Sequence, residues 1–184
     1  MSKNMIVQKL DRRIQRTQRA LMDALLALSL EKGYDAVSIR DIAERADIAY
    51  STFFRHYSSK DDLLATEINT VIDDLQTLIQ QTQAKSREAE GILIFQHVAA
   101  HPTFFRVLFT SQGTSRVLED AQREIVAHLV QTKVFPADSA VPPEIAANHF
   151  VVTLLALIRW WLDHDMPYSV EQMASYYSHL LMQG

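Results

Sequence analysis

The stretch DIAYSTFFRHYSSKDDLL, residues 47–64, concentrates rings and positive charge in one short segment. Between positions 50 and 60 it holds seven aromatic or cationic side chains: Tyr50, Phe53, Phe54, Arg55, His56, Tyr57 and Lys60. Helical periodicity divides such a set between an inner and an outer face. We expect the inner rings to anchor a small helical unit and the outer groups to form a binding surface.

Two short helices are predicted around this stretch. Ser38-Ile39-Arg40-Asp41 has the spacing of a capping box, with Asp in place of Glu, and opens a helix over about 39–46. A second helix follows over about 50–56, and Asp47 between them can adopt a left-handed backbone conformation. Helices this short need a third helix to pack on, which residues 12–32 can supply. This is the arrangement of a helix-turn-helix unit, whose second helix can enter the DNA major groove.

Charge is distributed unevenly along the chain. Residues 1–60 hold eleven Lys and Arg against seven Asp and Glu, a net charge of +4. Residues 61–184 hold seven against fifteen, a net charge of −8, so that the whole chain carries −4. A basic first third on an acidic remainder favours a polyanion bound at one end only.

Composition excludes several classes of protein. The 184 residues are 48% hydrophobic with four Gly and five Pro, which indicates a folded chain with a core. The absence of Cys excludes disulfides and thiolate metal sites. No apolar run near the N-terminus resembles a signal peptide, and the longest uncharged apolar stretch, 145–158, is shorter than the roughly 20 residues of a bilayer span. We expect a cytoplasmic protein without a membrane partner.

Helical periodicity is nearly continuous, so the predicted fold is all-α with about nine helices. Beyond the two short helices, the pattern predicts a long helix from about residue 59 and further helices at about 88–100, 103–111, 114–132, 144–164 and 170–182. A helix-turn-helix domain is expected over residues 10–70, and a helical bundle for ligand binding and dimerisation over residues 71–184.

The sequence VSIRDIAERADIAYSTFFRHYSSKDDLL (37–64) resembles the DNA-binding region of the tetracycline-repressor (TetR) family of bacterial transcription regulators. The preceding LEKGYDA (30–36) is similar to the end of that family's first helix. The resemblance implies a dimeric regulator that binds double-stranded DNA. By position, it implies DNA contacts from Ser38, Arg40, Tyr50, Ser51, Thr52, Phe54, Arg55, His56 and Lys60, with residues 50–52 reading bases and Lys60 lying against a phosphate.

Two departures from the family pattern affect this surface. Phe54 stands where the family usually has Tyr, so a hydroxyl that commonly binds a phosphate is missing. Ala49 replaces a frequent Ser at the N-cap of the second short helix, which costs roughly 1 kcal/mol of local stability. Phe53 and Tyr57 are expected in the core rather than on the DNA. The arginines at positions 12, 13, 16 and 19 fit either a solvated helix face or contacts with the DNA backbone.

The C-terminal stretch 148–184 is the best candidate for a dimer interface. It resembles the C-terminal region of one TetR subgroup, and two apolar helices there can form a four-helix interface with a second copy. The residues expected at this interface are Phe150, Leu154, Ile158, Trp161, Tyr176 and Leu180. The alternative is that both helices belong to the chain's own core.

Residues 95–113 combine rings with a few polar groups, which fits a pocket for a flat, partly apolar effector. The candidate ligand-binding residues are Phe95, His97, Phe104, Phe105 and Phe109, and the alternative is an ordinary aromatic core. His97 and His101 have a spacing that can present two imidazoles to a metal. No carboxylate or third His lies at a matching distance in sequence, although His149 or His164 could approach in the fold. No metal or cofactor is expected.

The leading hypothesis is a dimeric repressor that a small molecule releases from an inverted-repeat operator by shifting the population of its conformations. A helical enzyme acting on a hydrophobic substrate is the alternative from another class. The chain has no cysteine, nucleophile elbow, phosphate-binding glycine loop or HExxH pair, so we expect no enzyme activity. A non-specific architectural DNA binder is the third hypothesis, which the −8 charge of residues 61–184 disfavours.

Overall fold

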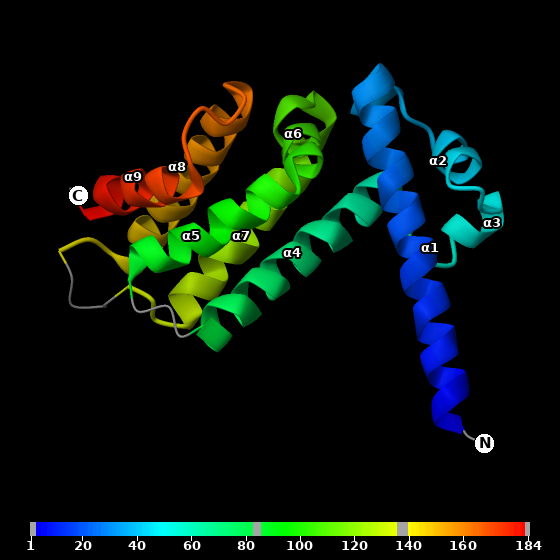
Figure 1. The fold of residues 1–184 in the computed structure, drawn as a ribbon, viewed down its shortest axis with the longest axis horizontal. Coiled ribbons are helices and arrows are strands. Elements are labelled where there is room, and N and C mark those ends of the chain that lie inside the picture. Colours follow the sequence, from blue (N-terminus) through cyan, green and yellow to red (C-terminus); the bar gives the residue numbers. More distant parts are fainter. Residues whose placement is uncertain (1–2, 83–85, 136–139, 183–184) are drawn as a thin grey trace. The chain divides into compact units, whose positions relative to one another are not determined.

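The described part of the protein, residues 3–82, 86–135 and 140–182 of a computed structural model, is all-helical (Figure 1). It contains nine α-helices and two 3₁₀-helices and no strand, which confirms the predicted fold class. The α-helices are α1 (Lys3–Lys32), α2 (Ile39–Arg45), α3 (Tyr50–Phe53), α4 (Lys60–Thr82), α5 (Arg87–Ala100), α6 (Pro102–Thr110), α7 (Ser115–Gln131), α8 (Pro143–Asp163) and α9 (Val170–Met182). The 3₁₀-helices are η1 (Tyr34–Ala36) and η2 (Gln112–Thr114).

Two helices differ from the sequence-based prediction. α1 begins at Lys3 rather than near residue 12. α3 ends at Phe53 rather than at residue 56, although the Tyr57 N–H still donates to the Phe53 carbonyl at 2.9 Å. The backbone of residues 54–57 therefore continues the helix as hydrogen-bonded turns.

The chain divides into two compact units, which are described separately. The first contains Met1–Glu67 and Ser111–Thr114, and the second contains Ile68–Thr110 and Ser115–Gly184. The division between them falls inside α4, close to the boundary at residue 70 that the sequence suggests.

The first unit is built around the apolar side of α1. Leu21, Leu25 and Leu28 of α1 are buried. They share this core with the buried side chains of α2, α3 and α4, which are Ile42, Ala43, Phe53, Leu63 and Leu64. Burying a side chain such as Phe53 contributes about 1.5–3 kcal/mol. α2 and α3 are therefore held by tertiary packing and not by their own length.

The turn between α2 and α3 follows from a left-handed residue at the end of α2. Asp47 has a φ of 54°, as predicted. The Ile48 N–H donates to the Ala43 carbonyl at 2.9 Å and the Asp47 N–H donates to the Glu44 carbonyl at 3.2 Å. These two bonds form a Schellman motif, which ends α2 and fixes the direction in which α3 starts.

The second unit is a bundle in which α5 packs along α9, and α8 packs against α6 and α7. Its core includes Phe95 of α5, Trp161 of α8 and Tyr177 of α9, all of which are at most 2% exposed. The Trp161 indole N–H donates to the Tyr168 carbonyl at 2.9 Å. α8 is long and apolar enough to cross a membrane by length and composition alone. Its packing within the bundle fits a core helix.

Close packing of α5 on α9 depends on Gly91. A Cβ at this position would lie 2.9 Å from Cδ1 of Tyr177 and 3.2 Å from Cα of Ala174. The second of these atoms is backbone, so it cannot move aside without shifting α9. A glycine in a helix interior costs about 1 kcal/mol relative to alanine, and the close approach of α9 explains why it is tolerated here.

We predict that Gly91→Ala lowers the unfolding midpoint. In an open helix the substitution would stabilise by about 0.5–1 kcal/mol. Here, overpacking against Tyr177 and Ala174 should reverse the sign and cost about 1–3 kcal/mol. Chemical denaturation followed by circular dichroism measures this difference. A variant more stable than the wild type would show that α5 and α9 do not pack this closely.

Candidate nucleic-acid interface and ligand cavity

The start of α2 is fixed by the predicted capping box. The Ser38 hydroxyl accepts from the Asp41 N–H at 3.2 Å, and the Asp41 carboxylate accepts from the Ser38 N–H at 2.8 Å. Lys32 lies 2.8 Å from the same carboxylate. The Lys32 ammonium, and next the Ser38 hydroxyl and N–H, hold the pKa of Asp41 well below its usual range. Ser38 is exposed but already bonded within the chain, so its main role here is to cap α2.

α3 presents an outer face to solvent. Tyr50 and Phe54 are 51% and 48% exposed, and Ser51 and Arg55 are exposed as well. Thr52 and His56 are half-buried. On the inner face, Phe53 and Tyr57 are buried, which confirms their predicted place in the core.

A chain of ring contacts connects the exposed face of α3 to the core. The ring centroids of Tyr50 and Phe54 are 5.2 Å apart, those of Phe54 and Phe53 are 5.5 Å apart, and those of Phe53 and Tyr57 are 5.8 Å apart. The first two pairs meet edge to face, which is a favoured geometry for aromatic rings. Phe54 therefore supports the orientation of Tyr50 through packing, a role that needs no hydroxyl.

The cations of the first unit fall into two groups. Lys32 pairs with Asp41, and Arg45 forms two hydrogen bonds of 2.7 Å with Glu31. In contrast, Arg40 and Arg55 are exposed, and neither forms an ion pair within the described part of the chain. Arg40 on α2 and Arg55 after α3 are thus the cations available to an anionic partner at this face.

The resemblance implied that Lys60 lies against a DNA phosphate. In the structure, its ammonium group is instead hydrogen-bonded within the chain. Its ammonium donates to the carbonyls of Tyr34, Asp35 and Val37 at 2.7, 3.3 and 3.0 Å, and it lies 4.6 Å from the centroid of the Tyr34 ring. The Tyr34 hydroxyl donates to Asp61 at 2.6 Å. Because an ammonium has three N–H donors, this geometry leaves none for a phosphate. In the free protein Lys60 thus joins η1 to the start of α4.

The second unit contains an apolar cavity of about 400 Å³, which is partly open to solvent. α4, α5, α6, α7 and α8 all contribute to its wall. Of its 27 lining residues, 20 are apolar, including Phe104, Phe105 and Phe109 of α6. This volume and lining are typical of sites for small apolar molecules.

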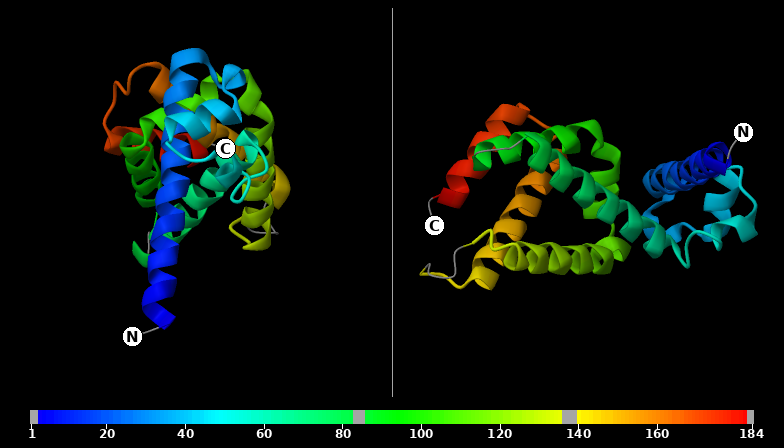
Figure 2. Two further views of the ribbon diagram at one scale, coloured as in Figure 1. Left: turned by 90° about the vertical axis from the view of Figure 1, so that its right-hand side faces the viewer. Right: turned by 90° about the horizontal axis from the view of Figure 1, so that it is seen from below.

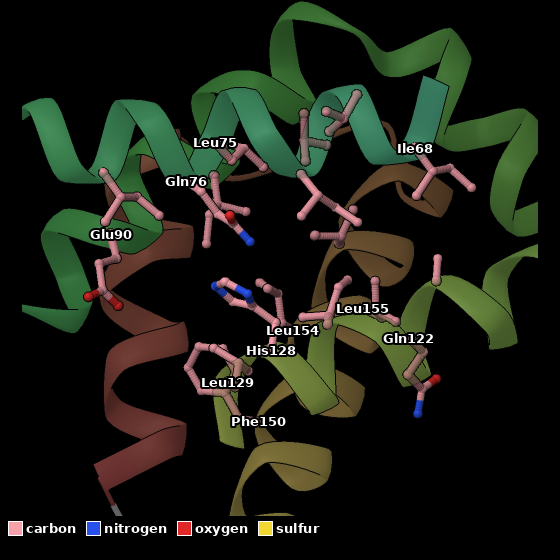
Figure 3. A pocket seen from close by; sticks show the side chains of 18 of the residues that line it. Ile68, Leu75, Gln76, Glu90, Gln122, His128, Leu129, Phe150, Leu154 and Leu155 are labelled. Carbon is pink, nitrogen blue, oxygen red and sulfur yellow. The ribbon is translucent and has the colours of Figure 1, made fainter. Parts of the chain in front are cut away.

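Few polar groups face the cavity. Gln76 of α4 and His128 of α7 approach one another across it (Figure 3). Arg87 and Glu90 of α5 also line it, but they pair with each other at 2.9 Å. The guanidinium of Arg87 lies 5.1 Å from the ring of Phe150, so the pair is held against an aromatic wall.

The predicted ligand residues divide into two groups. Phe104, Phe105 and Phe109 line the cavity, whereas Phe95 and His97 do not. Phe95 packs edge to face on Trp161, with ring centroids 5.5 Å apart, so it belongs to the core.

Sequence reasoning missed the contributions of α4 and α7 to the cavity wall. Their signal is a stripe of apolar residues at helical spacing, such as Val71, Leu75 and Ile79 of α4. Such a stripe fits a simple core equally well, because periodicity shows which face is covered and not whether a space remains beneath it.

His97 lies beside His101, with ring centroids 4.8 Å apart. Its Nε2 atom is buried without a hydrogen-bond partner, and burial, followed by the charge of His101, lowers the pKa of His97. Nothing in the described ranges brings a third His, Asp or Glu to such a pair in a metal-binding cluster.

The residues predicted for dimerisation also divide into two groups. Phe150, Ile158 and Trp161 are buried in this chain's own core and are not available to a second chain, whereas Leu154 is half-buried and lines the cavity. This corrects the prediction, because α8 is apolar nearly all round and its inner face could not be told from its outer face. Tyr176 and Leu180 of α9 are exposed.

Other apolar residues of α8 and α9 are exposed to solvent. Val152 and Trp160 on the outer face of α8 are 44% and 42% exposed. The rings of Trp160 and Tyr168 stack with centroids 6.0 Å apart, and Tyr168 meets Tyr176 at 5.4 Å. Together with Leu180, these residues form what we call the α8–α9 patch.

Comparison with known families gives two matches along the chain. Residues 21–66 match the model for bacterial regulatory proteins of the tetR family, and residues 91–183 match the model for a transcriptional regulator C-terminal region. The second match alone covers about half of the chain.

Among curated proteins, the chain is 27% identical over 173 residues to an HTH-type transcriptional regulator, YxbF, of Bacillus subtilis. That match covers 78% of this chain and 46% of YxbF. It is 32% identical over 125 residues to an HTH-type regulator of Haemophilus influenzae, covering 63% of this chain and 60% of that protein. The chain thus spans about half the length of these relatives. The families and relatives are transcriptional regulators and not enzymes, in agreement with the expectation from sequence.

Solved structures give the same fold. The regulator FadR from Bacillus subtilis in complex with stearoyl-CoA superposes with a TM-score of 0.65 at 15% identity. The match covers 89% of this chain and 96% of FadR.

We predict that Lys60→Met destabilises the first unit in the absence of DNA. The substitution keeps the aliphatic stem but removes three hydrogen bonds to carbonyls, each contributing about 0.5–1.5 kcal/mol. Thermal unfolding of the free protein measures the effect. Arg55→Met is the matched control, because Arg55 is an exposed cation and its removal should leave the midpoint unchanged. Equal midpoints for Lys60→Met and the wild type would instead support a role for Lys60 in DNA contact only.

Proposed function

Since the chain belongs to the TetR family of bacterial regulatory proteins, we propose that it is a dimeric, sequence-specific DNA-binding repressor that leaves an inverted-repeat operator when a small apolar molecule fills its cavity. The observation that carries this proposal is the surface of α3. Tyr50 and Ser51 are exposed at its start while Phe53 anchors it from below. Helices of this arrangement place the residues at their start against base edges in the major groove.

The proposed DNA contacts follow from what remains free at this surface. Tyr50, Ser51 and Thr52 read bases, and Arg40 and Arg55 bind phosphates on either side. His56 is half-buried and close to Tyr57, and it is proposed to reach the backbone of the DNA. Ser38 and Lys60 act indirectly, by holding α2 and η1 in place. Phe54 is proposed to contact the DNA sugar and to support Tyr50.

We propose that the chain dimerises, because a single α3 is short. One short helix contacts too few base pairs for useful specificity, and two such helices one DNA turn apart, about 34–36 Å, solve this. The α8–α9 patch supplies an exposed apolar face on which two copies can pair about a twofold axis. The chain is proposed to act in the cytoplasm, where the DNA lies.

The cavity is the proposed effector site. Its mostly apolar wall favours a ligand with an apolar body, and Gln76 and His128 can each bond one polar group. FadR, whose fold is similar, binds stearoyl-CoA. The proposed mechanism is a population shift, in which a ligand that binds one conformation better than the other favours the state with lower DNA affinity.

A non-specific architectural DNA binder is the competing function. Residues 61–184 carry a net charge of −8, which opposes non-specific attraction to DNA over most of the chain. The two hypotheses differ in one quantity, the ratio of specific to non-specific affinity.

We predict that the protein retains particular fragments of its own genome and binds them at least about 1,000-fold more tightly than random DNA at moderate salt. Tyr50→Ala should reduce this ratio about 10-fold, because it removes discrimination at particular base pairs. Leu30→Ala, at an exposed apolar residue of α1 away from α3, is the control and should behave like the wild type. A ratio near one for the wild type would overturn the proposed function.

We also predict that filling the cavity blocks the effector. Linear fatty acids, acyl-CoA thioesters and alcohols of increasing length are the probes. A member of this series at about 100 times its dissociation constant should stabilise the protein by about 2.7 kcal/mol. Ala121→Phe, which places a ring inside the cavity, should weaken binding at least about 10-fold and keep DNA bound. Ala127→Phe, on the exposed side of α7, is the control. Probe binding that both variants retain would place the effector elsewhere.

A further inference from the structure

One turn of α1 ahead of the helix-turn-helix core, residues 13–16, is not covered by the rest of its unit. Residues 13–16 are all exposed, so this turn of helix faces solvent on every side. Thr17, Gln18 and Ala20 are half-buried, and full burial begins at Leu21. Figure 1 and the left view of Figure 2 show α1 continuing past α2 and α3. The family match also begins at residue 21, so this segment lies outside it.

The same segment carries a dense positive charge. Residues 3–20 hold six Lys and Arg and a single Asp, a net charge of +5, which exceeds the +4 of residues 1–60 as a whole. Arg13, Arg16 and Arg19 are exposed, and none of them forms an ion pair with another described residue. Their spacing of three places them on neighbouring positions of one helix side.

Such a segment is unfavourable by itself. Like charges three or four positions apart destabilise a helix by about 0.2–0.5 kcal/mol per pair, and an unsupported stretch of this length is marginal in water. An anionic partner along the arginine side removes the repulsion. A helix of about 18 residues is about 27 Å long, and DNA offers a phosphate for about every 1.7 Å of its axis. One segment can therefore meet several phosphates.

We propose that the exposed arginine side of α1, formed by Arg13, Arg16 and Arg19, is a second DNA-contacting surface, which binds phosphates outside the half-site that α3 reads. This inference rests on the proposed function and adds a sequence-independent contact to it. Both surfaces belong to the first unit. The Arg13, Arg16 and Arg19 guanidinium groups bind phosphate oxygens and raise affinity for all sequences alike.

The test compares two triple variants with the same change of charge. R13Q/R16Q/R19Q removes the three arginines of α1. R116Q/R123Q/K133Q removes three exposed cations of the second unit and is the control. Dissociation constants are measured for the selected operator and for random DNA over a range of salt concentrations. Unfolding midpoints of both variants are measured in parallel and should lie within a few degrees of the wild type, because all six positions are exposed and surface charges contribute little to stability.

The α1 variant should bind about 10- to 100-fold more weakly near 0.1 M salt, equally for operator and random DNA. The slope of log affinity against log salt should fall by about 0.9 for each phosphate that the variant no longer neutralises, which is up to about 2.7 for each copy of the chain on the DNA. Hydroxyl-radical footprints should show weaker protection outside the half-sites only. The control should change affinity by less than about threefold.

Equal slopes for the two variants would overturn the inference while leaving operator selection by α3 intact. Binding of the α1 segment to vesicles of phosphatidylglycerol, with an unchanged DNA slope, would overturn it in favour of a membrane surface. A wild type that selects no operator overturns the proposed function itself, and this inference with it.

Discussion

The burial of Phe53 is the interaction on which the reading surface depends. α2 and α3 have seven and four residues, and helices of that length do not persist alone in water. Phe53 is fully buried beneath α3, and through Phe54 it also supports the exposed ring of Tyr50. The left-handed Asp47 then sets the direction in which α3 leaves α2. A small apolar core and one turn residue thus position the side chains that are proposed to face DNA.

The first unit was predictable from sequence because its signals are local. Ser38 and Asp41 have the spacing of a capping box, Asp47 suits a left-handed turn, and Phe53 follows the core periodicity of α1 and α2. Lys60 was not predictable. Its ammonium contacts three carbonyls of residues 34–37, more than 20 positions earlier, and sequence spacing carries no information on such a contact.

In the second unit, the helices were predictable from sequence but their packing was not. Periodicity predicted its helices nearly to the residue, but it did not predict which faces meet. α8 is apolar on most sides, so Phe150, Ile158 and Trp161 could be assigned either to a partner chain or to the core, and burial placed them in the core. The cavity could not be predicted for the same reason. Five helices each contribute a part of its wall, and no single segment signals that their apolar faces leave a space between them.

The central claim is that two copies of α3 lie in the major groove, with Ser51 near the bases. The absence of cysteine makes this directly measurable, because Ser51→Cys provides a single attachment site for an iron–EDTA group. On the selected operator, the labelled protein should cleave DNA at two symmetrical positions separated by one helical turn, about 10 base pairs, or a whole multiple of it. Cleavage at one position only, or spread evenly along the duplex, would contradict the account.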